Sequence, residues 1–556
     1  MDVREVAVVG FGTMGAGIAE VFVRAGIAVV AIEVDPAALE QGKVTLDRSL
    51  GKAVTRGKLT EQEKTEILSL VRPVGSVAEA AAADLVVEVV PERMEIKRQV
   101  FAELDRVCRP EAILTTNTSS LSVTAIAAGT RLPGRVAGLH FFNPAQVMRL
   151  VEVVTTVSTA PETGQAVTDL VRRLGKTPVQ VADRAGFIVN ALLLPYLNQA
   201  ARMLETGYAT REDIDAAATA GIGLPMGPLA LLDLIGLDTA LSILEVLHGE
   251  FGGPRFSAAP MLRRLVEAGL TGRKTGRGFY DYETKEPGQR PGPGTIINGD
   301  DTAGPATVTL IGGGAGPGTP LGAMIAAAGW PLAADPGGPG PHEAGPGGGH
   351  RGGAPDDNDP DIHHPDIHHP GAGFPGLHDP GVRDPGAGLP RDAGPDRLII
   401  VHAKEPSAGV LGAALATGRP ADAVGLHLAG DKLAELISTP MSAPRAIEAA
   451  AVLAGRLGVA VVRCKDRPGF LAGALLYPHL NDAVRMVQDG YASAADIDTA
   501  MTLGCGYPRG PMQLLDAAGA GPALAVLTLM HERYGDPAFA PAPLLAEHAA
   551  ARQAFC

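Results

Sequence analysis

The chain has 556 residues, 46% of them hydrophobic and 19% charged, so it can form three or four domains of about 100–200 residues. Its formal net charge of −14 argues against nucleic acid or an anionic membrane as a partner. No apolar run reaches the roughly 20 residues of a membrane span, and the four cysteines form no close pairs typical of a disulfide scaffold or a thiolate zinc site. Because the N-terminus also lacks a signal-like segment, a soluble cytoplasmic protein is expected.

Residues 1–185 alternate short β-rich runs with helical patterns, which predicts an α/β domain with a parallel sheet and helices on both faces. Helices are expected at 13–25 and 94–107. The expected strands are Val6–Val9, Ala28–Ile32, Asp84–Val90, Ala112–Thr116, Val136–Leu139 and Glu152–Val154. This order is typical of a Rossmann-type nucleotide-binding domain.

Residues 186–285 have a helical pattern and form a predicted all-α domain. Its first helix is expected over 186–206, kinked or broken at Pro195. Further helices are expected at 211–220, 228–235, 239–248 and 259–268, and the first strand-like run comes only at 278–282.

Residues 286–395 are rich in glycine, proline and histidine and are predicted to be a low-complexity, disordered linker. Within it, VTLIGGGAGPGTPLG (308–322) resembles the remnant of a second nucleotide-binding start. A frameshift or gene-model error would give the same composition, so both origins stay open. The His-rich run DIHHPDIHHP (361–370) lacks a defined geometry, and no metal site is assigned to it.

The segment 184–233 is repeated at 467–516, with a constant offset of 283 residues. Upstream, VAGLHFFNPAQVMRLVEV is echoed by the shorter AVGLHLAGDKLAELIS. The repeat predicts a tandem duplication, with a degenerate second Rossmann remnant at 396–466 and a second all-α domain at 467–556.

Gly10, Gly12 and Gly15 form G-x-G-x-x-G directly after the first strand, where a helix begins. The glycines permit a tight turn and close approach of the backbone to a pyrophosphate, and the helix N-terminus favours its negative charge. Glu33 stands at the end of the second strand, where an acid binds ribose hydroxyls and repels a 2′-phosphate. The motif predicts an NAD site; the alternative is a tight turn in an ordinary βαβ unit.

His140 ends a predicted strand, which places it at the edge of a parallel sheet where ligands bind. Glu152 follows twelve residues later in LVEVV. A carboxylate bound to one imidazole nitrogen fixes the tautomer and makes the other nitrogen a better base. The pair could serve as the base of a hydride-removing enzyme, or it could be a strand-end histidine with a surface ion-pairing glutamate.

Three stretches, NTSSLSV (117–123), GLHFFNPAQVMRLVEV (138–153) and DRAGFIVNALLLPYLNQA (183–200), together resemble the short-chain 3-hydroxyacyl-CoA dehydrogenases of the 3-hydroxybutyryl-CoA type. The resemblance runs from Val6 to Tyr282 and includes GRKTGRGFYDY, and a weaker match covers 397–545. It implies reversible NAD-dependent oxidation of (S)-3-hydroxyacyl-CoA to 3-oxoacyl-CoA. The pathway could be butanoate metabolism, fatty-acid β-oxidation or aromatic catabolism.

The resemblance also implies roles for single residues. The catalytic set is His140 as base, Glu152 as its partner, and Ser119 and Asn190 as substrate donors. The NAD-binding set is Gly10, Gly12, Thr13, Met14, Gly15, Glu33, Glu92, Lys97, Ser119, Asn143 and Lys274. The substrate-binding set is Ser49, Arg56, Lys58, Ser119 and Asn190. Without the resemblance, Ser119 would be equally compatible with a helix N-cap, and Asn190 with a locally satisfied amide.

Residues 43–64 are a basic segment in an acidic chain and include Arg56 and Lys58. They could bind the phosphates of coenzyme A, or form a solvated helix face. A dehydrogenase of free hydroxy acids would instead need an arginine clamp for a carboxylate. A non-catalytic structural relative is a further alternative, against which the intact His140 and Glu152 argue.

The second half departs from the pattern of the first. Gly473 replaces Asn190, and only eight residues separate His427 from Glu435. It is therefore expected to be non-catalytic. Family members pair their helical domains in dimers, so the second helical domain could provide an intrachain pseudo-dimer; a homodimer is the alternative.

Overall fold

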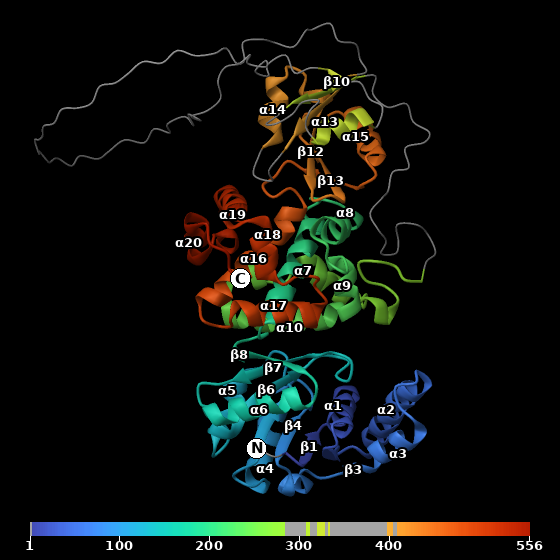
Figure 1. The fold of residues 1–556 in the computed structure, drawn as a ribbon, viewed down its shortest axis with the longest axis vertical. Coiled ribbons are helices and arrows are strands. Elements are labelled where there is room, and N and C mark those ends of the chain that lie inside the picture. Colours follow the sequence, from blue (N-terminus) through green and yellow to red (C-terminus); the bar gives the residue numbers. More distant parts are fainter. Residues whose placement is uncertain (1–2, 284–306, 312–319, 328–331, 334–396, 404–408) are drawn as a thin grey trace, which may run out of the picture.

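The computed structural model describes residues 3–283, 307–311, 320–327, 332–333, 397–403 and 409–556 (Figure 1). In this part of the chain, the first sheet has eight strands in the order β3-β2-β1-β4-β5-β6-β7-β8. Its strands are β1 (Glu5–Val9), β2 (Ala28–Ile32), β3 (Val71–Val74), β4 (Leu85–Glu88), β5 (Ile113–Thr116), β6 (Val136–Phe141), β7 (Leu150–Thr155) and β8 (Thr177–Ala182). All neighbours are parallel except β6 and β7.

The six strands expected from the sequence are present, which confirms the α/β class of this region. The strands β3 and β8 were not expected: β3 contains Pro73 and is only partly buried, so its sequence lacks the continuous apolar run that marked the central strands. Helices cover both faces, and their bounds are α1 (Thr13–Arg24), α2 (Pro36–Thr55), α3 (Glu61–Ser69), η1 (Val77–Ala82), α4 (Met94–Val107), α5 (Val123–Ala127), η2 (Pro133–Arg135) and α6 (Pro161–Arg173).

A helical region follows the first sheet. It contains α7 (Val189–Glu205), α8 (Arg211–Ala216) continuing into the π-helical turn η3 (Ala217–Ile222), α9 (Pro228–Ile235), α10 (Leu237–Phe251), α11 (Gly253–Phe256), α12 (Pro260–Glu267) and η4 (Arg273–Thr275). Of the kink or break expected at Pro195, the break does not occur, because α7 continues through this residue; a kink there stays a prediction. Most of α7 is buried, and this packing outweighs the cost of about 3 kcal/mol for an interior proline.

The strand expected at 278–282 was also wrong. These residues form a turn with isolated bridges, and the amides of Phe279 and Tyr280 donate to the carboxylate of Asp233 at 2.9 Å. The aromatic residues that suggested a strand therefore belong to a turn whose backbone amides bind the buried carboxylate of Asp233.

The second half contains its own sheet, in the order β10-β9-β11-β12-β13-β14. Its elements are β9 (Thr307–Ile311), α13 (Pro320–Ala327), β10 (Leu332–Ala333), β11 (Arg397–His402), α14 (Val410–Ala416), η5 (Pro420–Asp422), β12 (Ala423–Ala429), β13 (Leu433–Ser438), α15 (Pro444–Arg456) and β14 (Ala460–Lys465). Elements β9, α13 and β10 come from the region expected to be a linker and form the β-α-β start of this sheet. The His-rich run 361–370 lies outside the described residues.

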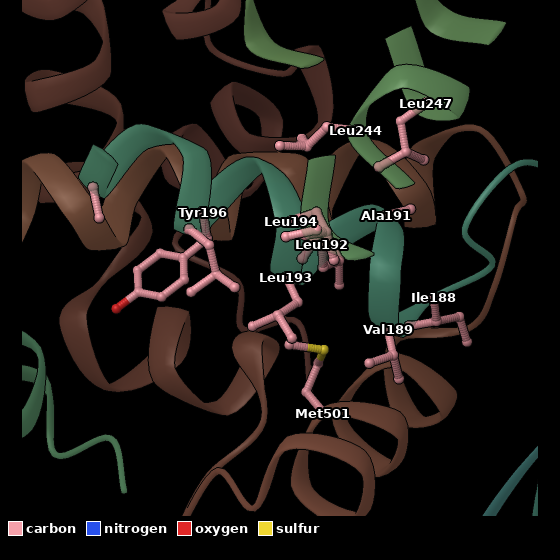
Figure 2. Packing of buried hydrophobic residues seen from close by; sticks show 14 of the residues in the cluster. Ile188, Val189, Ala191, Leu192, Leu193, Leu194, Tyr196, Leu244, Leu247 and Met501 are labelled. Carbon is pink, nitrogen blue, oxygen red and sulfur yellow. The ribbon is translucent and has the colours of Figure 1, made fainter. Parts of the chain in front are cut away.

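The second helical region contains α16 (Ala472–Gln488), α17 (Ala494–Cys505), α18 (Pro511–Ala518), α19 (Ala520–Tyr534), η6 (Pro537–Phe539) and α20 (Pro543–Ala551). The two helical regions pack together between the two sheets, with α7 against α16 (Figure 1). Leu193 of α7 lies against Met501 of α17 in the shared core (Figure 2). Among the described helices, none alone has the length and hydropathy of a membrane span; the bent pair α18 and α19 meets that test only when taken together.

Candidate active site

The antiparallel pairing of β6 and β7 places His140 directly opposite Glu152. His140 Nδ1 lies 2.7 Å from Glu152 Oε2, and both side chains are buried. The other carboxylate oxygen, Oε1, accepts hydrogen bonds from the amides of Ile188 and Val189 at 3.0 Å each. These amides belong to the first turn of α7, where the helix dipole favours a negative charge. The carboxylate is therefore held in place and occupies Nδ1, so Nε2 is the ring nitrogen of His140 that remains for a proton transfer.

Ser119 and Asn190 lie beside that nitrogen. Ser119 Oγ is 3.0 Å from His140 Nε2, and Asn190 Nδ2 donates to the backbone oxygen of Ser119 at 3.4 Å. The rings of Phe142 and Phe187 flank the imidazole at centroid distances of 4.6 and 5.6 Å. The structure thus brings together the four residues predicted to be catalytic, although they come from the loop after β5, from β6, from β7 and from α7.

A cavity of about 790 Å³ opens at this group. The residues of the first α/β region that line this cavity include Met14, Asn117 and Asn143. Beyond His140 the lining is mostly apolar, from α7 and α9, and it also includes residues 504–507 of the second half. Such a cavity suits an apolar chain with a polar reacting end.

The glycine turn has the shape needed for a dinucleotide. Gly10 has φ +98°, and a Cβ there would lie 2.7 Å from the Val89 oxygen. A Cβ on Gly15 would lie 1.9 Å from the Gly10 oxygen, whereas none of the described residues lies within 4 Å of a Cβ on Gly12. Open space therefore stands at the start of α1, whose first amides are not capped by any described side chain.

Glu33 lies beside the glycine turn. Its Oε2 accepts from the amide of Phe11 at 3.0 Å, so the carboxylate lies at the glycine turn as expected for a ribose-binding acid. These residues fit NAD: the turn and the α1 N-terminus would hold the pyrophosphate, and Glu33 the ribose.

Glu92, which is partly exposed, and the buried Lys97 belong to a network around the loop that carries Ser119. Glu92 Oε1 accepts from Thr118 Oγ1 at 2.6 Å and from the Ser119 amide at 2.9 Å. Burial opposes ionisation of Glu92, but Lys97 and these donors outweigh it and lower its pKa. Lys97 is 1% exposed, with Nζ 2.9 Å from Glu88 and 3.4 Å from Glu92. Direct contact of Glu92 or Lys97 with NAD stays a prediction.

Glu88 is a member of this network that the sequence reasoning did not single out. It is fully buried at the end of β4, where it also accepts from Thr116 Oγ1 at 2.6 Å. The available signal was a lone acid in an apolar strand, since a buried charge needs a partner. Asn117 was missed as well: its Oδ1 accepts from the amide of Phe141 at 2.7 Å, which ties the ends of β5 and β6 together.

The remaining predicted residues lie further out. Thr13 is the exposed first residue of α1. Ser49 on α2 accepts from Gln146 Nε2 at 3.1 Å, while Arg56 and Lys58 are exposed at the turn between α2 and α3. Lys274 forms an ion pair with Asp238 at 2.5 Å and is not among the described residues that line the cavity. The roles of these residues also stay predictions.

The second half repeats the strand pairing that places a histidine opposite a glutamate, but it does not repeat the hydrogen bond between them. His427 faces Glu435 across β12 and β13, yet its Nδ1 lies 2.7 Å from the Ala403 oxygen and its Nε2 is 3.9 Å from Glu435. Burial raises the pKa of Glu435 to about 7, even though the backbone amides of Leu471 and Ala472, at the start of α16, donate hydrogen bonds to its carboxylate. Burial also lowers the pKa of His427. The imidazole is turned away from its acid, which supports the prediction of a non-catalytic second half.

A glycine turn fitted to a dinucleotide and a buried His–Glu pair facing an apolar cavity define a dehydrogenase. The sequence model described as "3-hydroxyacyl-CoA dehydrogenase, NAD binding domain" matches residues 5–184. The model of that enzyme's C-terminal domain matches twice, at 186–282 and 469–554. The chain belongs to the 3-hydroxyacyl-CoA dehydrogenase family, and its cofactor is NAD.

Individual relatives agree with this family. The chain is 33% identical to the 3-hydroxyadipyl-CoA dehydrogenase of Escherichia coli K12, over 99% of this chain and 98% of the relative. It is 46% identical to a 3-hydroxybutyryl-CoA dehydrogenase of Mycobacterium tuberculosis over 50% of this chain and 99% of the relative. A crystal structure of 3-hydroxybutyryl-CoA dehydrogenase from E. coli K12 covers 99% of both chains with a TM-score of 0.75 and 32% identity.

Proposed function

We propose that the protein catalyses the reversible, NAD-dependent oxidation of (S)-3-hydroxyacyl-CoA to 3-oxoacyl-CoA. The observation that carries this proposal is the His140–Glu152 pair, with Ser119 3.0 Å from the free imidazole nitrogen at the mouth of the cavity. The relatives named for 3-hydroxybutyryl-CoA and 3-hydroxyadipyl-CoA support a CoA thioester over a free hydroxy acid.

In this reaction His140 Nε2 accepts the proton of the substrate hydroxyl. Glu152 holds Nδ1–H and stabilises the imidazolium that results. Ser119 and Asn190 are neutral donors suited to the substrate oxygens. When bound in the glycine turn, NAD would supply the acceptor for the hydride that leaves C3 of the substrate. The flanking Phe142 and Phe187 rings exclude water from the imidazole, which keeps the proton transfer between His140 and the substrate.

The hairpin of α2 and α3 would hold the CoA moiety. Its turn exposes Arg56 and Lys58, whose charges suit phosphate groups, and the Ser49–Gln146 contact ties α2 to the loop after β6. Phosphate binding there and acyl binding in the cavity would be simultaneous. A soluble cytoplasmic enzyme of acyl-CoA metabolism, in butanoate, fatty-acid or aromatic catabolism, fits this proposal.

The second half would have arisen by tandem duplication, supported by the double match of the C-terminal domain and the constant offset of 283 residues. Its helical region packs on the first as a partner subunit would, so a monomer or a weak homodimer is expected. Sedimentation of the full chain would test this expectation, and a tight homodimer would contradict it.

The decisive assay follows absorbance of reduced nicotinamide with acetoacetyl-CoA and, separately, with free acetoacetate. Wild type is expected to reduce only the thioester, and His140→Gln is expected to lose activity. His427→Gln is the matched control and should keep the wild-type rate. Equal rates in wild type and His140→Gln would overturn the mechanism, and turnover of acetoacetate alone would favour a dehydrogenase of free hydroxy acids.

A further inference from the structure

The second half supplies part of the wall of the active-site cavity. The loop 504–507, at the C-terminal end of α17, lines it together with residues of α7 and α9 from the first half. A Cβ on Gly504 would lie 2.9 Å from Leu150 Cδ2 and 3.1 Å from Val189 Cγ2, so this loop packs on β7 and α7, the elements that carry and hold Glu152. Both halves of the chain therefore enclose the cavity, although the four residues at its reacting end belong to the first half.

Cys505 is the side chain of this loop that can meet a ligand. Gly504 and Gly506 carry no side chain, and Tyr507 is only 5% exposed. Cys505, by contrast, is partly exposed and lines the cavity. A Cβ on Gly506 would lie 3.9 Å from Pro225 Cγ and no closer to any other described residue, so open space adjoins Cys505 at this point of the wall.

The wall around Cys505 is uncharged. No Lys, Arg, Asp or Glu is among the described residues that line the cavity, and the first half contributes Leu193, Leu194 and Leu231 to the lining. Partial burial, with the negative Glu152 nearby, raises the pKa of the Cys505 thiol to about 12, so the thiol is neutral. Such a wall suits the methylene groups of an acyl chain.

The repeat places the equivalent loop of the first half in the reciprocal position. At the offset of 283 residues, Gly221 corresponds to Gly504, and a Cβ on Gly221 would lie 2.6 Å from Leu433 Cδ2 on β13 of the second half. Each loop therefore packs on the opposite half, but only the loop of the second half meets a hydrogen-bonded histidine and glutamate. Ile222, the counterpart of Cys505, is not among the described residues that line the cavity.

We propose that Cys505 of the second half is a specificity-determining residue, which contacts the acyl chain of the substrate beyond C3 and limits the chain length that the cavity accepts. The first half alone positions the reacting end, and a four-carbon acyl group has only a methyl group beyond C3, so it makes the least use of this wall. Longer chains would place more methylene groups against it. This inference rests on the proposed function. It gives the second half a part in substrate choice, although that half has no working histidine–glutamate pair of its own.

The test measures kcat/KM for saturated 3-hydroxyacyl-CoA thioesters of four, six and eight carbons in wild type, Cys505→Ala, Cys505→Leu and Cys505→Phe. The ratio of the eight-carbon to the four-carbon value should fall as the side chain at this position becomes larger. In Cys505→Phe the ratio is expected to be at least tenfold below that of wild type, because each methylene displaced from an apolar wall lowers kcat/KM by about fourfold. Cys505→Ala should raise the ratio about twofold.

Ile222→Ala and Ile222→Phe are the matched controls, because they change the same position of the repeat outside the cavity lining, and they should leave the ratio unchanged. The KM for NAD should stay at the wild-type value in every Cys505 variant. Equal losses at all chain lengths, or the same change of the ratio in the Ile222 variants, would overturn the inference and leave the proposed function standing.

The smaller substitutions keep the test decisive if Cys505→Phe does not fold. An unchanged ratio in both Cys505→Ala and Cys505→Leu would then overturn the inference. If wild type oxidised none of the thioesters, the proposed function and this inference would fail together.

Discussion

The hydroxyl of Tyr491 donates a hydrogen bond of 2.8 Å to the carbonyl oxygen of Phe187, and so joins the second half of the chain to the active site of the first. Phe187 has φ +48°, a left-handed conformation that costs a non-glycine residue about 1–3 kcal/mol. It directly precedes Ile188 and Val189, whose amides hold Glu152, and its ring flanks His140. Tyr491 thus supports a strained turn next to His140 and Glu152, the proposed catalytic pair.

Tyr491→Phe should therefore lower kcat by roughly threefold to tenfold, because Glu152 and His140 would be held less firmly, while KM changes little. The loss of stability should be about 1 kcal/mol. The checks are steady-state kinetics and the pH profile of kcat, which a purely structural role would leave unmoved.

The chain contains its own control for this variant. Tyr208 is the repeat counterpart of Tyr491, and its hydroxyl bonds the carbonyl of Phe470, which has φ +47° in the second half. Tyr208→Phe should destabilise the chain about as much and leave kcat unchanged. Equal effects of the two variants on kcat would show that the contact at Phe187 has no catalytic role.

Glu152→Gln should reduce kcat by about 10²–10⁴-fold. A glutamine can keep its oxygen toward the amides of Ile188 and Val189, but it then presents an N–H group to His140 Nδ1. The imidazole would have to take the tautomer protonated at Nε2, and that nitrogen could no longer accept the substrate proton. The rate of acetoacetyl-CoA reduction measures this loss, and Glu435→Gln should match wild type. A Glu152→Gln enzyme with more than a tenth of the wild-type kcat would disprove the orienting role.

Much of the site could be predicted from the chain because its signals are local. The glycine turn, the strand ending in His140 and the acid in LVEVV each follow from strand alternation and spacing. The contact of Tyr491 with Phe187 could not be predicted, since it depends on how the two halves of the chain pack, and no short-range pattern encodes that packing. The helix does not break at Pro195 for a related reason: the local cost of an interior proline is real, but burial of α7 outweighs it.

Glu435 makes the stability of the second half dependent on pH. Its pKa is about 7 in the folded chain, against an ordinary value of 4.5, so the folded state retains a proton that the unfolded state has lost. Stability from this group is full below pH 4.5 and falls as pH rises to 7, by up to about 3 kcal/mol. Glu435→Gln cannot ionise, so it should be more stable than wild type by about 1–3 kcal/mol above pH 7 and nearly equal to it near pH 4.

Thermal midpoints of wild type and Glu435→Gln, recorded across this pH range, check that prediction. Glu448→Gln is a suitable control, because Glu448 forms an exposed ion pair with Arg463 in the same region and should show no such pH-dependent gain. A constant difference between Glu435→Gln and wild type at all pH values would mean that Glu435 does not titrate in this window.

The exposed charges of the α2–α3 turn give the last prediction, which concerns CoA binding. The double change Arg56→Ala with Lys58→Ala should raise KM for acetoacetyl-CoA about fivefold at low salt and leave kcat and KM for NAD unchanged, because these side chains would contact only the CoA phosphates. The difference from wild type should shrink as salt rises, since exposed charges are screened. Arg72→Ala is the control. It removes an exposed charge on β3 that is paired with Glu79, and it should keep the wild-type KM for acetoacetyl-CoA. A KM for acetoacetyl-CoA that is unchanged in the double variant would place the CoA phosphates elsewhere.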